Sequence, residues 1–198
     1  MKKSTKRILV ICAAFLMVVG WTWRYISLNE YWESTIPAEY TETVFSIGET
    51  VTFGKDIFLP EGLTLCANGF TTVDYDSYLA NNNISLESTP NNPPDKLALV
   101  EVTLSNACDI DKSINLSEFS LHGIDFLFSS NMELLAAANP ILGGNIGVTL
   151  RPEESCDFVL VYELRDEYLS RHTWNNFDSY ALYLTTTVYP ARQEIKVQ

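Results

Sequence analysis

The feature that most constrains this chain is an uncharged apolar run near its start. The run ILVICAAFLMVVGWTW extends from Ile8 to Trp23 and follows four basic residues within residues 1–7. At about 1.5 Å per residue a helix over this run measures about 24 Å, and extension to Ile26 brings it near the ~30 Å of a bilayer's hydrocarbon core. Because basic flanks stay in the cytoplasm, we expect residues 8–26 to be a transmembrane signal anchor and residues 1–7 a cytoplasmic tail.

A cleaved secretory signal is the alternative, because both begin with a basic segment and an apolar stretch. Val18 and Gly20 offer only a weak cleavage site, and the bulky Trp21 and Trp23 follow it. The anchor is therefore the preferred interpretation. Either alternative exports the remainder of the chain.

Charge is divided unevenly along the chain. Five of the 13 basic residues precede Leu28, whereas all 25 acidic residues lie at or after Glu30. From Leu28 onward eight basic residues therefore accompany 25 acidic ones, a balance of −17. A surface of this sign repels nucleic-acid phosphates. We expect no nucleic-acid partner, contact with the membrane through the N-terminal helix, and an unidentified protein or cell-wall partner.

The exported region divides into a linker and one domain. Residues 27–44 mix acidic residues, Ser, Thr and Pro without a clear period, which is typical of a juxtamembrane linker. Residues 45–198 have the length of a single folded domain. The predicted location is the cell membrane, with one pass and the C-terminal domain extracellular.

Alternating apolar residues predict strands in this domain. The clearest pattern runs from Ala98 to Ser105 and stops at Asn106, and Phe158–Glu163 and Tyr180–Tyr189 alternate similarly. The final strand is expected to break near Pro190, since proline is tolerated only at edges and bulges. Weaker strands are expected at Thr50–Phe53, Leu63–Ala67, Phe119–Leu121 and Phe126–Phe128, and short helices at Tyr75–Asn81, Met132–Ala138 and Arg165–Asn176. This order predicts a mostly β fold, an immunoglobulin-like antiparallel β-sandwich with short connecting helices.

Four segments of the exported region resemble a known family. They are IGETVTFGKDIF (Ile47–Phe58), LALVEVTLSN (Leu97–Asn106), LRPEESCDFVLVYEL (Leu150–Leu164) and YALYLTTTVYPARQEIKV (Tyr180–Val197). In this order they resemble uncharacterised, membrane-anchored domains of unknown function with an immunoglobulin-like β-sandwich from Gram-positive bacteria. The resemblance implies the topology and the fold, and it brings no catalytic motif and no cofactor.

Three cysteines, Cys66, Cys108 and Cys156, lie in the exported region, where disulfides are permitted. Cys108 follows the end of one predicted strand and Cys156 begins another, so antiparallel neighbours would bring the two together. A Cys108–Cys156 disulfide is therefore predicted, with three reduced, buried thiols as the alternative. Cys66 lies in an apolar strand pattern and is expected in the core.

Few residues suggest chemistry. His122 and His172, the only histidines, have no zinc-binding spacing around them, and no Gly-x-Ser-x-Gly elbow occurs. Two acidic pairs have the one-residue spacing of calcium loops without the rest of the pattern, and we interpret them as solvated loops. A glycine cluster lacks the Lys and Ser or Thr of a phosphate loop and is expected to be a turn. The acidic pairs are Asp74 with Asp76 and Asp109 with Asp111, and the glycine cluster is Gly143, Gly144 and Gly147.

The sequence therefore predicts no catalytic residue, no metal site, no cofactor and no enzymatic activity. The preferred function is a non-catalytic binding or interaction module at the cell surface. One alternative is a metal-assisted or hydrolytic extracellular enzyme, which would use the acidic pairs and a pocket formed by Trp174, Tyr180 and Tyr183. Another is an accessory subunit of a membrane complex.

Overall fold

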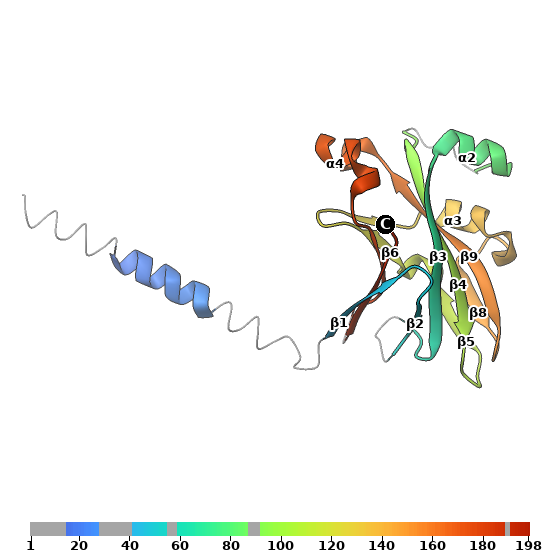
Figure 1. The fold of residues 1–198 in the computed structure, drawn as a ribbon, viewed down its shortest axis with the longest axis horizontal. Helices are drawn as coiled ribbons and strands as arrows, with labels where there is room; N and C mark the ends of the chain where they lie inside the picture. Colours follow the sequence, from blue (N-terminus) through green and yellow to red (C-terminus); the bar gives the residue numbers. More distant parts are fainter. Residues whose placement is uncertain (1–14, 28–40, 55–58, 87–91, 189–190) are drawn as a thin grey trace, which may run out of the picture. The chain divides into compact units, whose positions relative to one another are not determined.

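The chain divides into two units, residues 1–40 and the compact unit Thr41–Gln198 (Figure 1). The computed structural model describes residues 15–27, 41–54, 59–86, 92–188 and 191–198. The compact unit begins at Thr41, because Thr41–Ser46 already pairs as a strand. The sequence patterns place the domain boundary at residue 45 instead.

Residues 15–27 of the first unit are helical. Taken singly, the helices in the described part of the chain are all too short or too polar to reach across a lipid bilayer. The predicted span begins at Ile8, and its residues 8–14 lie outside the described residues. The same is true of the predicted tail at 1–7 and of linker residues 28–40.

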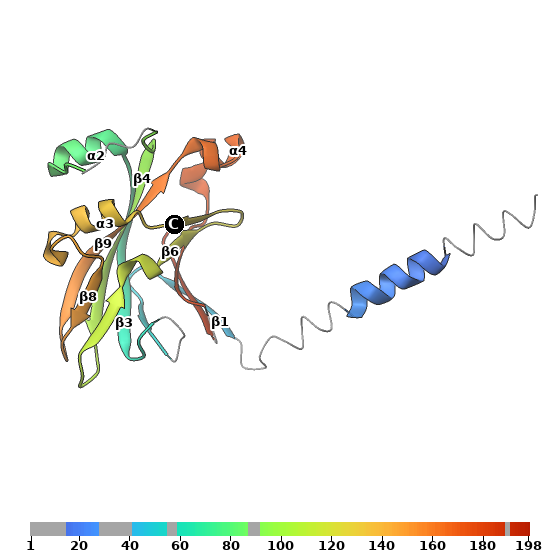
Figure 2. The ribbon, with the colours of Figure 1, turned by 180° about the vertical axis from the view of Figure 1, so that it is seen from behind.

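The described residues of the compact unit form two larger sheets and one small sheet (Figures 1 and 2). Sheet A has the order β1 (Thr41–Ser46), β11 (Ala191–Lys196), β10 (Tyr183–Thr187), β6 (Ser120–His122) and β7 (Leu127–Ser129). Sheet B has the order β2 (Thr50–Thr52), β3 (Leu63–Asp74), β4 (Lys96–Asn106) and β9 (Ser155–Leu164). Sheet C pairs β5 (Lys112–Asn115) with β8 (Gly147–Leu150). The prediction of a mostly β, sandwich-like fold is confirmed.

One strand pair corrects the prediction of an all-antiparallel sandwich. β1 pairs with β11 in parallel, from Thr41 opposite Ala191 to Ser46 opposite Lys196. The alternation of apolar residues shows which face of a strand is apolar, but not the direction of the strand beside it. The parallel pairing of β1 with β11 could therefore not be predicted from the sequence. The predicted break near Pro190 is confirmed, since β10 ends at Thr187 and β11 begins at Ala191.

Short helices connect the strands, as predicted. They are α2 (Tyr75–Asn82), α3 (Met132–Ala138), α4 (Arg171–Asn175) and the 3-10 turns η1 (Leu116–Glu118), η2 (Pro140–Leu142), η3 (Asp166–Tyr168) and η4 (Phe177–Ser179). The single helix predicted at Arg165–Asn176 is wrong. Leu169 is extended, with φ −116° and ψ 153°, and Ser170 then starts α4 by accepting a hydrogen bond from the Thr173 amide.

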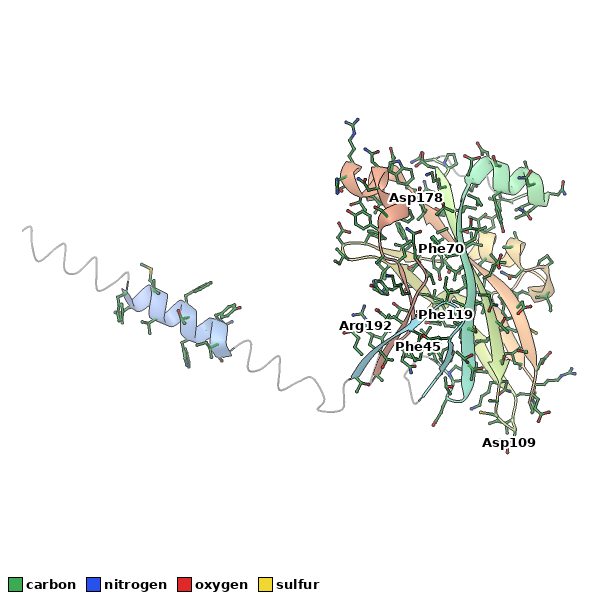
Figure 3. All side chains as sticks on the ribbon, in the orientation of Figure 1. Phe45, Phe70, Asp109, Phe119, Asp178 and Arg192 are labelled. Atoms are coloured by element: carbon green, nitrogen blue, oxygen red, sulfur yellow. The ribbon has the colours of Figure 1, made fainter. Side chains whose placement is uncertain are left out.

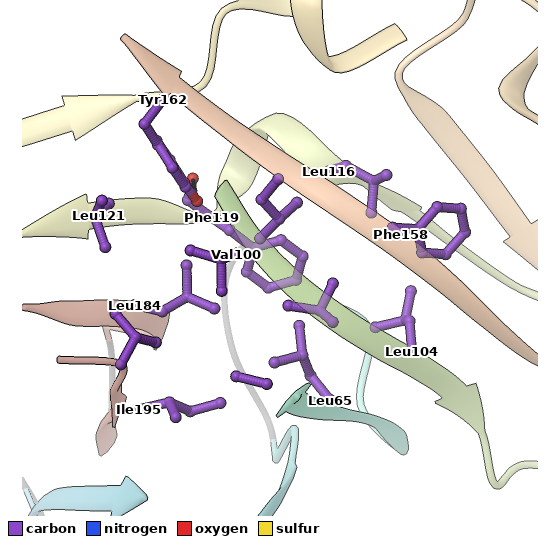
Figure 4. Packing of buried hydrophobic residues seen from close by; sticks show 14 of the residues in the cluster. Leu65, Val100, Leu104, Leu116, Phe119, Leu121, Phe158, Tyr162, Leu184 and Ile195 are labelled. Atoms are coloured by element: carbon purple, nitrogen blue, oxygen red, sulfur yellow. Dashed lines mark hydrogen bonds between the residues drawn. The ribbon is translucent and has the colours of Figure 1, made fainter. Parts of the chain in front are cut away.

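The main core lies between sheets A and B (Figure 4). Sheet B contributes Leu65, Val100 and Phe158, and sheet A contributes Leu184 and Ile195. Each such side chain adds about 1.5–3 kcal/mol of burial free energy. This packing fixes which face of each strand points outward and therefore which polar residues face solvent.

A second, smaller core lies on the outer face of sheet B. It is formed by Tyr75 of α2, Leu134 of α3, Leu97 and Leu99 of β4, and Val161 of β9. Figure 2 shows α2 and α3 beside the same strands. These helices cover the part of the face around Leu97, Leu99 and Val161, whereas Glu101 and Asp157 on the same two strands are exposed.

Candidate functional site

The open part of the outer face of sheet B carries polar side chains at alternate positions. Val102 and Leu104 of β4 point into the main core, so Glu101 and Thr103 point outward. Asp157 of β9 lies opposite Thr103 in the ladder and shares this face. The strand register therefore places two exposed carboxylates, from Glu101 and Asp157, on neighbouring strands.

A bulge in β3 adds an amide to the same face. The register of β3 with β4 shifts between Ala67 and Gly69, which leaves Asn68 as the extra residue. Its Nδ2 donates to the Thr103 hydroxyl at 2.7 Å, and that hydroxyl donates to Asp157 Oδ1 at 2.6 Å. This chain of hydrogen bonds orients the Asp157 carboxylate.

The segment after α3 forms a wall beside these strands. Asn139, which is buried, ends α3 and faces the edge of β9. Its side chain accepts from the Val159 amide and donates to the Val159 carbonyl, both at 2.8 Å, and it also donates to Leu135 O at 2.7 Å. Pro140 and Ile141 follow it in η2, which Gly143 closes with φ 60°. The amide thus holds the wall at a fixed distance from β9.

A hollow of about 400 Å³ lies between this wall and the sheet. Glu101, Asp157 and Asn68 are among its polar lining residues, and Pro140 and Ile141 are among its apolar ones. No Lys, Arg or His is among the described residues that line it. Two carboxylates beside an apolar wall favour a ligand that carries both a positive charge and a short apolar stem.

A second hollow, of about 240 Å³, lies between β8 and β9. Val148 and Leu150 of β8 and Cys156 of β9 are in its lining. It shares Ile141 and Phe158 with the first hollow, so the two adjoin along β9. The exposed fraction of Ile141, which borders both, is 71%.

The outer face of sheet A carries an ion cluster that the sequence patterns did not indicate. Glu194 is only 3% exposed, and its Oε1 lies 2.8 Å from His122 Nε2 and 2.6 Å from Arg192 Nε. The His122 ring stacks on Tyr183 with 5.5 Å between centroids, and its Nδ1 lies 3.1 Å from Gly123 O. Figure 3 labels Arg192 on this sheet. His122 belongs to β6 and Glu194 belongs to β11, so the contact between them links these two strands.

The predicted Cys108–Cys156 disulfide is not formed in this structure, where Cys66, Cys108 and Cys156 are all free. Cys156 lies opposite Leu104 and packs against the main core, whereas Cys108 lies beyond the end of β4, with its thiol 3.7 Å from Glu61 O. Pairing of the two under oxidising conditions stays a prediction. Burial, and then the charges of Glu154 and Asp157, raise the pKa of the Cys156 thiol. Cys66 is half-buried and lies outside the core clusters, which corrects its predicted position.

The acidic pairs have separate positions. Asp74 is the N-cap of α2 and accepts from the Ser77 amide at 2.9 Å, and this hydrogen bonding lowers the pKa of its carboxyl. Asp109 and Asp111 lie in the exposed loop between β4 and β5 (Figure 3 labels Asp109). Among the residues that the structure describes, no group of three or more His, Cys, Asp or Glu is placed to hold a metal ion.

The other candidates are likewise dispersed. Trp174 and Tyr180 pack against the main core, whereas Tyr183 stacks on His122 on the outer face of sheet A, so the structure does not bring the three into one pocket. His172 is exposed on α4. Gly143 and Gly144 have positive φ, which fits the predicted turn, and Gly147 begins β8.

The fold and this site define a mostly β, sandwich-like domain with an acidic hollow on one outer face. Residues 42–193 match the family described as Domain of unknown function (DUF5028), and the chain belongs to this family. No curated protein matches the chain significantly.

Solved structures from Gram-positive bacteria are similar to the chain. An uncharacterised β-sandwich protein of Clostridium difficile 630 is 12% identical, with a TM-score of 0.43 over 81% of this chain and 97% of that one. The yjhA protein of Bacillus subtilis is 17% identical, with a TM-score of 0.44 over 78% and 99%. A conserved hypothetical protein of Bacillus anthracis is 16% identical, with a TM-score of 0.40 over 75% and 96%.

Proposed function

We propose that this chain is a non-catalytic binding module that takes a cationic group of its partner into the hollow on sheet B. The observation that carries the proposal is the lining itself, in which Glu101 and Asp157 stand beside the apolar Pro140 and Ile141. An alkylammonium or alkylguanidinium group, such as a lysine or arginine side chain, matches both parts of it. Its charge would meet the carboxylates while its methylene stem packs on the wall.

The charge of the rest of the domain supports this assignment. The balance of −17 from Leu28 onward attracts cations and basic surfaces over a distance of about one Debye length, ~8 Å at physiological salt. The association rate of a cationic partner would therefore be higher at low salt. The apolar Pro140 and Ile141 distinguish this hollow from acidic surface positions that offer electrostatic attraction alone.

We also propose that the domain is an immunoglobulin-like module held outside the cytoplasm by the N-terminal apolar segment. The support is the uncharged run from Ile8 to Trp23 behind four basic residues, together with the acidic composition of everything that follows. An N-terminal tag should remain in the membrane fraction with the domain. Protease added to intact cells with a permeable wall should digest the domain, and protection of the domain would contradict this topology.

Binding to the hollow is tested by saturation-transfer NMR of the full chain with n-butylguanidinium, and with the neutral n-butylurea as matched ligand. We expect saturation transfer to the guanidinium but not to the urea. Glu101→Gln should weaken binding of the cation at least about threefold, since a charge-assisted hydrogen bond is lost. Asp109→Asn, which removes the same charge from an exposed loop, is the control and should leave binding unchanged. Equal effects of the two substitutions would overturn the site.

A further inference from the structure

Part of β9 is an unpaired strand edge. In an antiparallel pair, alternate residues direct both backbone groups toward the partner and the residues between them direct both away. The Asn106 amide donates to Glu154 O at 2.9 Å, so the even-numbered residues of β9 face β4. The amides and carbonyls of Ser155 and Asp157 therefore point to the free edge, where no backbone group of the described residues pairs with them.

The next stretch of the same edge is closed. Val159 is bonded at both its amide and its carbonyl by the Asn139 side chain, and the Asn131 amide donates to Val161 O at 3.3 Å. The fold thus covers β9 from Val159 onward and leaves Ser155 and Asp157 open. A free strand edge is a ready template for another extended chain.

The two hollows lie on either side of the open stretch. Asp157, whose side chain is on the outer face, lines the acidic hollow, and Cys156, whose side chain points inward, lines the second hollow. A strand added at this edge would direct successive side chains to opposite faces. One side chain would then reach the acidic hollow and its immediate neighbours would reach the second hollow. Pockets for alternate side chains are how added strands gain specificity.

The charges select the side chain for the outer position. Glu101 and Asp157 line the outer hollow, and Glu154 is among the residues that line the second hollow, together with Val148, Leu150 and Ile141. No Lys, Arg or His belongs to the described lining of either. A basic residue fits the outer position, and apolar residues fit beside Val148, Leu150 and Ile141.

We propose that the open edge of β9 binds an extended segment of another protein chain by strand addition, with a basic residue flanked by apolar ones. The proposal rests on the proposed function, because the basic side chain occupies the cationic site described above. It adds the partner's conformation: main-chain hydrogen bonds to Ser155 and Asp157, and an alternating apolar–basic–apolar sequence.

The test selects binders of the immobilised full chain from a random hexapeptide library with acetylated and amidated ends. Enriched peptides should carry Lys or Arg between apolar residues. Methylation of every second backbone nitrogen of such a peptide should abolish binding in one register and spare it in the other, because only one edge of the peptide is paired. Loss of binding in both registers, no loss in either, or no enriched peptide, overturns strand addition.

Substitutions at Ser155 provide the second readout. Ser155→Pro removes an edge donor while leaving the hydrogen bonds of β9 to β4, since that amide points away from the ladder. It should weaken peptide binding at least about tenfold, the loss of a well-made hydrogen bond in a desolvated contact. Ser155→Ala is the control and should stay within about twofold of the wild-type affinity. Equal affinities of the two variants would overturn the use of this edge.

Glu101→Gln separates the failure of this inference from that of the proposed function. If the peptides bind but respond to Glu101→Gln and not to Ser155→Pro, the cationic site stands and strand addition fails. If they respond to neither substitution, both fail. If Ser155→Pro does not fold, the two N-methylated registers still decide the question.

Discussion

The outer faces of the two sheets use their carboxylates in opposite ways. On sheet A the buried Glu194 is bonded to His122 and Arg192 of its own domain. On sheet B the exposed Glu101 has no hydrogen bond or ion pair with any residue that the structure describes, and it lines a hollow with Asp157. A charge satisfied within the fold stabilises the fold, whereas a charge left open beside a cavity is available to a partner.

The largest expected effect is in the covered half of sheet B. Leu134→Ala should lower the free energy of unfolding by about 3 kcal/mol, because the buried side chain fills the space between α3 and the sheet. Urea unfolding followed by circular dichroism measures it. Met132→Ala, in the same helix but 62% exposed, is the control and should cost less than about 1 kcal/mol. Similar losses in both variants would show that α3 does not enclose a second core.

The next effect is on sheet A. Glu194→Gln should lower the free energy of unfolding by about 2 kcal/mol, since it removes the charge that His122 and Arg192 share. Glu42→Gln changes a weaker, exposed contact to the same Arg192 at 3.8 Å and should cost less than about 0.5 kcal/mol. A Glu194 variant as stable as the Glu42 variant would contradict the structural role of the cluster.

The contrast between the two faces was only partly readable from the sequence. The alternation from Ala98 to Leu104 predicts the inward face of β4, and the structure confirms it. The same pattern does not show that Leu97 and Leu99 are also buried, because α2 and α3 that cover them lie elsewhere in the chain.

The candidate site was missed for the same reason. Glu101, Asn68 and Asp157 come from three strands, and only the register places them together. The sequence pattern predicts an outward or irregular position for each of them, but it does not show which residues of other strands lie beside it. The pairing of His122 with Glu194 depends on β6 and β11 lying on either side of β10. Asn139, followed by Pro140 at the end of a predicted helix, was the one local signal that could have indicated the wall.

Thiol reactivity tests whether Cys156 is shielded on the inner side of β9. Because burial raises the pKa of the Cys156 thiol, we expect iodoacetamide to modify it more slowly in the folded chain than in urea at pH 8. The stability that follows from the raised pKa is present below the pKa of the unfolded thiol and is lost as pH rises through the folded value. Mass spectrometry of peptides measures the rates. Recovery of Cys156 linked to Cys108 in the unreduced protein would instead support the disulfide.

The smallest expected effect on stability is at the hollow itself. Glu101→Gln should change the free energy of unfolding by less than about 0.5 kcal/mol, because its exposed carboxylate has no partner in the described fold and removing one of two neighbouring negative charges relieves repulsion. The same urea unfolding measures it, with Glu194→Gln as the matched substitution. A loss close to that of Glu194→Gln would mean that Glu101 has a structural role.

The most direct test follows the backbone amide shifts of the full chain by NMR as n-butylguanidinium is added. The amides of residues 101–103 and 157–159 should shift in a saturable manner, with one dissociation constant, and those of residues 183–185 and 192–194 should not. Non-saturating shifts spread over both faces, or shifts confined to sheet A, would contradict a binding site formed by Glu101 and Asp157 on sheet B.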